Sequence, residues 1–104
     1  MYVVIFKASI KQLDASYEQL AERLRERALA SFGCIHFDAY TENDRELALS
    51  YWPNLESIRN WKQDAMHIAA QHQARDWYTR YGIEIAKLER SYGELALALN
   101  DSRG

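Results

Sequence analysis

One stretch of the sequence decides the fold: SYWPNLESIRNWKQDAMH, residues 50–67. Its sheet-like pattern ends at Trp52, because Pro53 cannot donate a hydrogen bond to a neighbouring strand, and a helical pattern begins directly afterwards. Between residues 50 and 81 the chain holds all three tryptophans, two of the three histidines and the only proline. Aromatic rings and a titratable imidazole are therefore delivered to one side of the fold, where we expect any pocket to lie.

Length and composition are those of one globular domain. The chain has 104 residues, of which 48% are hydrophobic and 27% are charged, with four glycines and one proline, which argues against disorder. The net charge of −2 comes from evenly mixed signs with no basic stripe, so nucleic acid is not expected as a partner.

The setting that the sequence favours is reduced and cytoplasmic. The single cysteine excludes an internal disulfide, and the longest apolar run is too short to span a bilayer, so no membrane partner is expected. Met1 leads directly into an apolar segment without a basic region or a small-residue cleavage site.

The first half of the chain switches between two periods. In residues 2–10 successive side chains alternate between two faces, and β-branched and aromatic types are frequent. In residues 14–32 apolar side chains instead recur every three to four positions. Asn43 and Asp44 are typical turn residues. The expected elements are a strand at 2–10, a helix at 14–32 ended by Gly33, and a hairpin of strands at 34–42 and 45–52.

The second half begins with a helix that we expect to be broken. Asp64 resembles a fresh N-cap, which predicts a stop after Trp61 and a restart at Ala65. The expected elements are helices at 54–61 and 65–73, a helical turn at 77–81 and a last strand at 83–92.

This order, β-α-β-β-α-β, predicts an α+β fold of the ferredoxin-like class: a four-stranded antiparallel sheet with helices on one face. The opposite face would leave Val3, Ile5 and the aromatic side chains of the hairpin exposed, so we expect a second copy of the chain to cover it in a homodimer. One domain at 1–94 is followed by a tail at 95–104, whose alternating apolar start suits contact with the partner subunit.

The same residues resemble the antibiotic biosynthesis monooxygenase domain family. The stretches that carry the resemblance are SYW at 50–52, LESI at 55–58, WKQD at 61–64 with His67, WY at 77–78 with Tyr81, and IAKLERSY at 85–92. The resemblance covers nearly the whole chain to about Tyr92 and implies a dimeric ferredoxin-like α/β barrel. Members include cofactor-independent monooxygenases of aromatic polyketides or quinols, haem-degrading enzymes, and small proteins without an established activity.

Trp61 and His67 are the catalytic candidates. The family's polyketide-oxidising members surround a matching tryptophan with an Asn four residues earlier and a Tyr six residues later, where this chain has Ser57 and His67. The break expected at Asp64 would turn His67 toward the same pocket as Trp61. A neutral imidazole there can take a proton from a phenol or quinol, which leaves a carbanion or enolate that reacts with oxygen. The alternative is that Trp61 is core and His67 packs at a helix start.

The other pocket candidates are mostly aromatic. Trp52 and Tyr40 alternate on the hairpin, Trp77 and Tyr81 can roof a cavity, and Arg75 can meet an anionic group of a substrate. The alternative for the tyrosines and tryptophans is a cross-strand pair and ordinary core packing.

Other possible sites are weaker. His36 and Asp38 could form a dyad on a strand, although exposed polar pairs are common there, and Cys34 is expected to be a buried, inert thiol. His67 and His72 are five residues apart rather than four, so no metal is expected. No glycine-rich loop exists for a flavin or nicotinamide, so no cofactor is expected.

These observations favour a cofactor-independent monooxygenase acting on a small aromatic or quinol-like compound. Three alternatives stay open at this point: a non-catalytic binding or stress-response module for a small hydrophobic molecule, a haem-degrading enzyme, and a dimerisation unit whose pocket is filled by its own side chains. In the haem-degrading members an Asn on the first strand and a His ten residues after the tryptophan act together. Here that strand offers Lys7 and Ser9, and the later position is Gln71.

Overall fold

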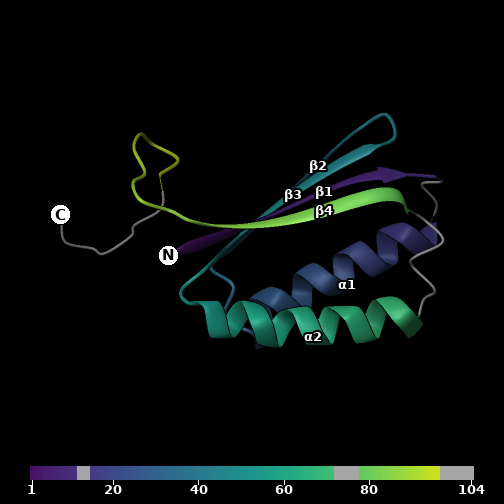
Figure 1. Ribbon diagram of the computed structural model, residues 1–104, viewed down its shortest axis with the longest axis horizontal. Helices are drawn as coiled ribbons and strands as arrows, with labels where there is room; N and C mark the ends of the chain where they lie inside the picture. Colours follow the sequence, from purple (N-terminus) through teal and green to yellow (C-terminus); the bar gives the residue numbers. More distant parts are fainter. Residues whose placement is uncertain (12–14, 72–77, 97–104) are drawn as a thin grey trace.

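The computed structural model describes residues 1–11, 15–71 and 78–96. Its elements follow the predicted order β-α-β-β-α-β (Figure 1). They are β1 (Tyr2–Ile10), α1 (Ala15–Ser31), β2 (His36–Glu42), β3 (Arg45–Trp52), α2 (Leu55–Gln71) and β4 (Tyr78–Lys87).

The four strands form one antiparallel sheet in the order β2-β3-β1-β4. Each βαβ unit is split, because β3 lies between β1 and β2, and β1 lies between β3 and β4. Both helices lie on the same side of the sheet (Figure 1). The ferredoxin-like α+β prediction is therefore confirmed for the single chain.

Two residues in the left-handed region of φ mark the predicted boundaries. Asn43 has φ 58° in the turn between β2 and β3, a conformation that asparagine tolerates better than most residues. Gly33 has φ 82° just after α1, as expected for a residue that ends a helix. The local chemistry of these two positions fixes where the first helix stops and where the hairpin turns.

The predicted break in the second helix is wrong. α2 runs without interruption from Leu55 to Gln71, and its N-cap is Asn54, whose Oδ1 accepts a hydrogen bond from the Ser57 N–H at 2.8 Å. Asp64 lies within the helix and binds the guanidinium of Arg27 on α1, which donates from Nε to Oδ2 and from Nη2 to Oδ1, the latter at 3.0 Å. A tertiary ion pair explains the aspartate that the sequence pattern suggested was a cap.

The last strand begins earlier than predicted. β4 starts at Tyr78 and ends at Lys87, so the expected helical turn is wrong from Tyr78 onward, and Trp77 lies outside the described residues. Tyrosine and threonine suit a strand, and here they extend the pairing with β1, with a register shift between Ser9 and Ile10.

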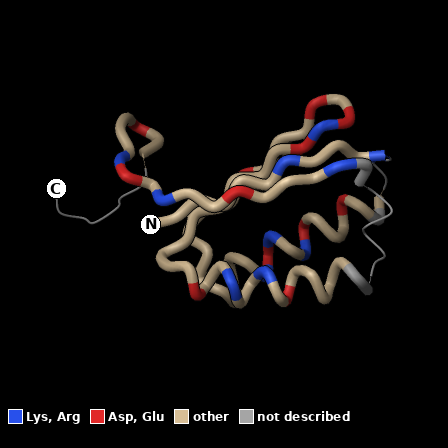
Figure 2. The backbone as a smooth tube through the Cα atoms, viewed as in Figure 1, with Lys and Arg blue, Asp and Glu red and all other residues tan. Residues whose placement is uncertain are grey.

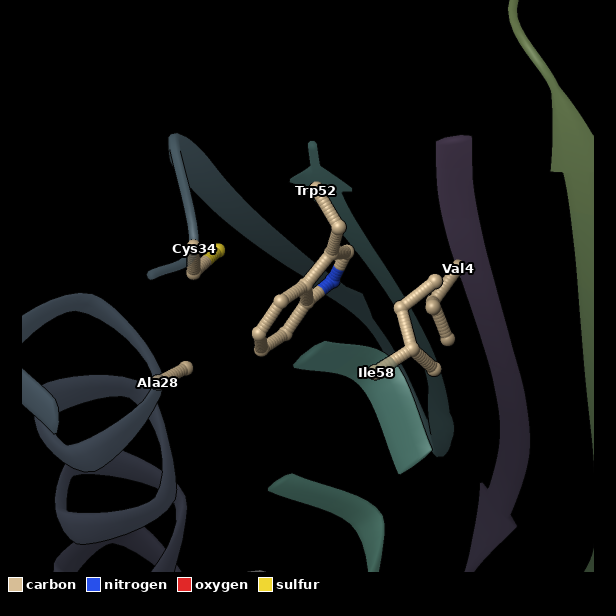
Figure 3. Packing of buried hydrophobic residues seen from close by; sticks show 5 residues of the cluster. All are labelled: Val4, Ala28, Cys34, Trp52 and Ile58. Carbon is tan, nitrogen blue, oxygen red and sulfur yellow. The ribbon is translucent and has the colours of Figure 1, made fainter. Parts of the chain in front are cut away.

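The core is centred on Trp52, which is completely buried. Its ring lies between Ala28 and Cys34 on one side and Val4 and Ile58 on the other (Figure 3). A second cluster joins the start of α1 to the end of α2 and contains Leu20, Ile68, Leu24 and Ala69. The space between the helices and the sheet is thus filled by aromatic packing at one end and by aliphatic packing at the other.

No helix in the described part of the chain is long and apolar enough to cross a bilayer.

Candidate functional site

Strand alternation divides the side chains of the sheet between two faces. Val4 and Trp52 pack against the helices, so their alternate neighbours share that helix-facing side. The other face carries the apolar side chains of Val3, Ile5, Tyr40, Leu47, Leu49 and Tyr51. Tyr40 is 59% exposed and Leu47 36% exposed on this second face.

An open hollow of about 910 Å³ lies at the end of the sheet where β2 and β3 are joined. All four strands contribute to it, and the chain carries both acidic and basic residues along this hairpin (Figure 2). Its lining residues are Lys7, Ala8, Ser9, Tyr40, Thr41, Glu42, Arg45, Glu46, Leu47, Arg80, Tyr81 and Gly82. The predicted pocket residues Tyr40 and Tyr81 are both part of this lining.

The hollow combines aromatic surface with positive charge. The Tyr40 side chain is largely exposed on the face away from the helices, whereas Tyr81 pairs with Ala8, and its ring lies 6.2 Å from the ring of Phe6 between centroids on the helix-facing side. Lys7 is paired with Glu84, Nζ to Oε1 at 3.0 Å, while Arg45 and Arg80 add two further cations. Such a surface can contact a flat apolar ring and a negatively charged substituent together.

Trp52 and Trp61 lie in the core instead of the hollow. Trp52 Nε1 donates to Ser50 Oγ at 2.8 Å, and Trp61 Nε1 donates to the carbonyl oxygen of Leu24 at 3.2 Å. Their ring centroids are 5.2 Å apart, and Phe37 meets Trp61 edge-on at 6.1 Å. Both indole N–H groups are thus bound within the protein, and both rings hold the helices to the sheet.

The structure does not bring His67 and Trp61 together. His67 is six residues after Trp61 on an unbroken helix, which separates their directions by about 120° around its axis. Trp61 packs against the core, and the side chain of His67 is exposed. The helix break that was expected to turn His67 inward does not exist. Arg75 and Trp77 lie outside the described residues.

His36 and Asp38 do form the pair that their spacing allows. His36 Nε2 and Asp38 Oδ2 are 2.8 Å apart, and the imidazole lies 5.9 Å from the Tyr51 ring. Both side chains are on the face away from the helices, at the opposite end of β2 from the hollow. They are absent from its lining.

Cys34 is buried, as predicted. Burial raises the pKa of its thiol, outweighing hydrogen bonds that act in the other direction, and its Sγ donates to the carbonyl oxygen of His36 at 3.2 Å. A protonated, enclosed thiol is a poor nucleophile. Among the described residues, no group of three side chains is arranged to hold a metal ion.

Glu46 is the functional candidate that the sequence reasoning missed. It pairs with Ala8 of β1 and Thr41 of β2, which places it on the helix-facing side of the sheet, where it is half-buried. Burial raises the pKa of its carboxyl group. A signal was available, because Glu46 alternates with Ala48, Ser50 and Trp52 on the inward face of β3.

Solved structures share this fold along most of their length. No protein-family model matches the chain. SnoaB, a cofactor-independent oxygenase from Streptomyces nogalater, aligns in a variant form with a TM-score of 0.73 and 12% identity, over 89% of this chain and 97% of SnoaB. A conserved protein of Methanosarcina mazei Go1 aligns with a TM-score of 0.70 and 21% identity, over 85% and 92%. An antibiotic biosynthesis monooxygenase aligns with a TM-score of 0.68 and 13% identity, over 86% and 100%.

These similarities concern the fold, and the chain has the fold of the antibiotic biosynthesis monooxygenase proteins. Sequence similarity places it more narrowly. It is 32% identical over 91 residues to YqjZ, an uncharacterized protein of Bacillus subtilis (strain 168), across 86% of this chain and 80% of YqjZ. The chain belongs to the same family as YqjZ.

Proposed function

We propose that the protein is a cofactor-independent monooxygenase of a small aromatic or quinol-like compound. The observation that carries the proposal is the hollow with Tyr40 and Tyr81 in its lining, in a fold shared with a cofactor-independent oxygenase. Exposed aromatic side chains around an open hollow suit a flat, apolar substrate.

The reaction that fits this proposal needs only the substrate and dioxygen. An activated methylene group, as in an anthrone, loses a proton to a protein base, and the resulting carbanion forms a carbon–oxygen bond with O₂. The hydroperoxide then loses water and leaves a carbonyl group, so that R₂CH₂ and O₂ become R₂C=O and H₂O. The protein must supply a base and an apolar surface that holds the ring.

The base predicted from the sequence is His67, with Trp61 beside it. The exposed position of His67 on α2 and the core position of Trp61 argue for separate roles. His67→Ala tests the first role directly: a large loss of kcat would support His67 as the base, and an unchanged kcat would assign the base elsewhere.

Oxygen uptake with a panel of anthrones and quinols tests the proposed function. We expect turnover by the purified protein in the presence of a chelator, with KM raised several-fold in Tyr40→Ala through loss of ring contacts. Tyr92→Ala is the matched control, because Tyr92 is 79% exposed and does not line the hollow. Absence of turnover across the whole panel would contradict the proposal.

A non-catalytic binding protein for a small hydrophobic molecule is the second candidate. The exposed position of His67 favours it, because a ligand in the hollow would then lack the predicted imidazole base. Binding of a quinone, measured by quenching of tyrosine and tryptophan fluorescence, together with no oxygen uptake would support this candidate.

We further propose a homodimer in a reduced, cytoplasmic setting. The sheet face away from the helices carries Val3, Ile5, Leu49 and Tyr51, and a second copy is a suitable cover for such an apolar surface. Leu95 is 96% exposed in the tail, which fits contact with the partner subunit. Light scattering after size-exclusion chromatography tests the dimer, and Leu49→Lys is expected to weaken it. A monomer at high protein concentration would contradict it.

A further inference from the structure

The hollow opens on the sheet face away from the helices, and its outermost row of paired residues carries two arginines. This row is Glu42, Arg45, Ser9 and Arg80, in the order of the strands. Because neighbouring strands are about 4.8 Å apart, the Cα atoms of Arg45 and Arg80 are separated by about 10 Å across Ser9. An arginine side chain is longer than half this separation, so both guanidinium groups can reach one group that lies over Ser9.

The two arginines are not neutralised in the way that the neighbouring lysine is. Lys7 is paired with Glu84, with Nζ 3.0 Å from Oε1. Within residues 1–11, 15–71 and 78–96, neither Arg45 nor Arg80 forms an ion pair. Like charges on one face of a sheet repel each other, so an anion between the two guanidinium groups would stabilise both.

The charge on this face of the hollow suits an anion with a single negative charge. The lining cations are Lys7, Arg45 and Arg80, and the carboxylates on the same face are Glu42 in the lining and Glu84 beside the lysine. Three cations against two carboxylates leave a net charge of +1. A planar guanidinium group can donate two parallel hydrogen bonds to a carboxylate, so this anion fits both the charge and the donors.

Gly82 leaves open space beside these cations. It pairs with Lys7, so a side chain at this position would lie on the same face of the sheet. Its φ is not in the left-handed region, and an added Cβ would meet no atom within 4 Å. Neither the backbone nor the packing of the described chain therefore requires glycine here, although glycine weakens a strand. Such a glycine is typical of a place that a ligand or another backbone approaches closely.

The row that contains Gly82 also offers an apolar contact for a ring. It consists of Tyr40, Leu47, Lys7 and Gly82. This row and the row of arginines are about 7 Å apart along the strands, which suits a ring joined directly to a carboxylate. The surface offered to a second copy is centred elsewhere, because Val3 and Tyr51 pair with each other at the other end of the same face.

We propose that this end of the sheet binds an aromatic carboxylate as the substrate of the oxygenase. The carboxylate lies over Ser9 between Arg45 and Arg80. The ring lies against Tyr40 and uses the space at Gly82. This inference rests on the proposed function and names its substrate class, an anthrone- or quinol-like compound that carries a carboxyl group. The carboxyl group takes no part in the reaction and holds the ring in position.

Binding of two unreactive quinones measures the role of the charge. Anthraquinone-2-carboxylate should bind the wild type about 10- to 100-fold more tightly than uncharged 2-(hydroxymethyl)anthraquinone, and this preference should shrink as salt is added. Arg80→Gln and Arg45→Gln should each lose most of the preference, whereas Arg80→Lys, which keeps the charge without the planar fork, should retain part of it. Arg59→Gln, at an exposed position on α2 outside the lining, is the matched control.

Gly82→Val tests the space without changing any charge. Valine favours a strand, and its Cβ would meet no atom within 4 Å, so the Tm should be kept or raised. Both quinones should bind several-fold more weakly, because the new side chain occupies the place of the ring. Unchanged binding would overturn the position proposed for the ring. A variant that becomes monomeric by light scattering would assign the glycine to a contact between subunits and overturn it equally.

Oxygen uptake with matched anthrones separates this inference from the function on which it rests. A lower KM for a carboxylated anthrone than for an uncharged one, lost in Arg80→Gln, supports both. Uptake with uncharged anthrones but equal affinity for the two quinones would overturn the carboxylate site and leave the oxygenase intact. Carboxylate-dependent binding without uptake on any anthrone would overturn the oxygenase and support a binding site for aromatic carboxylates.

Discussion

The two ends of the layer between the helices and the sheet are built in different ways. At the tryptophan end, formed by Val4, Ala28, Cys34, Trp52 and Ile58, the Trp52 ring is 0% exposed and its N–H is bound by Ser50. At the hairpin end, formed by Ala8, Glu46 and Tyr81, an aromatic side chain is 66% exposed and a carboxyl group is half-buried without a partner among the described residues.

The two ends of this layer therefore differ in what they contribute to stability. Large rings with satisfied polar groups stabilise the tryptophan end, whereas a half-buried carboxyl group without a compensating partner among the described residues lowers stability at the hairpin end. The predictions below test this difference.

Truncation at the tryptophan end should have the largest effect. Trp52→Ala removes a fully buried ring and the hydrogen bond to Ser50, so we expect the free energy of unfolding to fall by about 3–5 kcal/mol. Tyr81→Ala at the hairpin end, where the side chain is 66% exposed, should cost less than about 1.5 kcal/mol. Urea denaturation measures both, and equal losses would remove the distinction between the two ends.

Trp61 should behave as a stabilising residue. Trp61→Phe keeps much of the contact with Trp52 but loses the N–H donated to the Leu24 carbonyl, so we expect a loss of about 1–2 kcal/mol. Oxygen uptake per folded molecule should change little. A large fall in kcat without a change in stability would instead return Trp61 to the catalytic role predicted from the sequence.

Asp64 separates the two interpretations of the second helix. As an N-cap it would be replaced well by asparagine, whereas the ion pair with Arg27 needs the negative charge. Because Arg27 is 38% exposed, we expect Asp64→Asn to cost about 1 kcal/mol, and less at high salt. Thermal unfolding at low and high ionic strength measures this, with Asp64→Ala as the companion variant. An Asn variant as stable as the wild type would contradict the ion-pair account.

The fold could be predicted because its signals are local. The alternation in residues 2–10 and 45–52 and the turn at Asn43 gave strand limits that match β1 and β3. Asp64 and the start of β4 could not be predicted in this way, since each depends on a residue distant in the sequence. Arg27 lies 37 positions from Asp64, and Tyr81 pairs with Ala8 of the first strand.

The candidate site was predictable only in part. Tyr40 and Tyr81 were predicted as pocket residues because tyrosines often mark binding surfaces, and both contribute to the lining of the hollow. Trp52 and Trp61 were also predicted as site residues, but both lie in the core. A large aromatic ring suits a core as well as it suits a pocket, so the sequence could not separate the two. Glu46 was missed although it alternates with Ala48, Ser50 and Trp52, because its burial depends on the pairing of β3 with β1 and β2.

The smallest expected effect is on stability at Glu46, and its sign is informative. Burial raises the pKa of this carboxyl group in the folded state, so its contribution to stability is complete below the ordinary pKa of glutamate and is lost as the pH rises through the raised value. Glutamine has no charge to desolvate. The Tm of Glu46→Gln relative to the wild type should therefore increase from acidic to neutral pH, while Glu22→Gln, at an exposed position, should show no such trend. Thermal unfolding across this range measures the difference. A Glu46→Gln protein that becomes less stable than the wild type at neutral pH would mean that the carboxylate is stabilised by a partner, and the hairpin end would then be a second structural core.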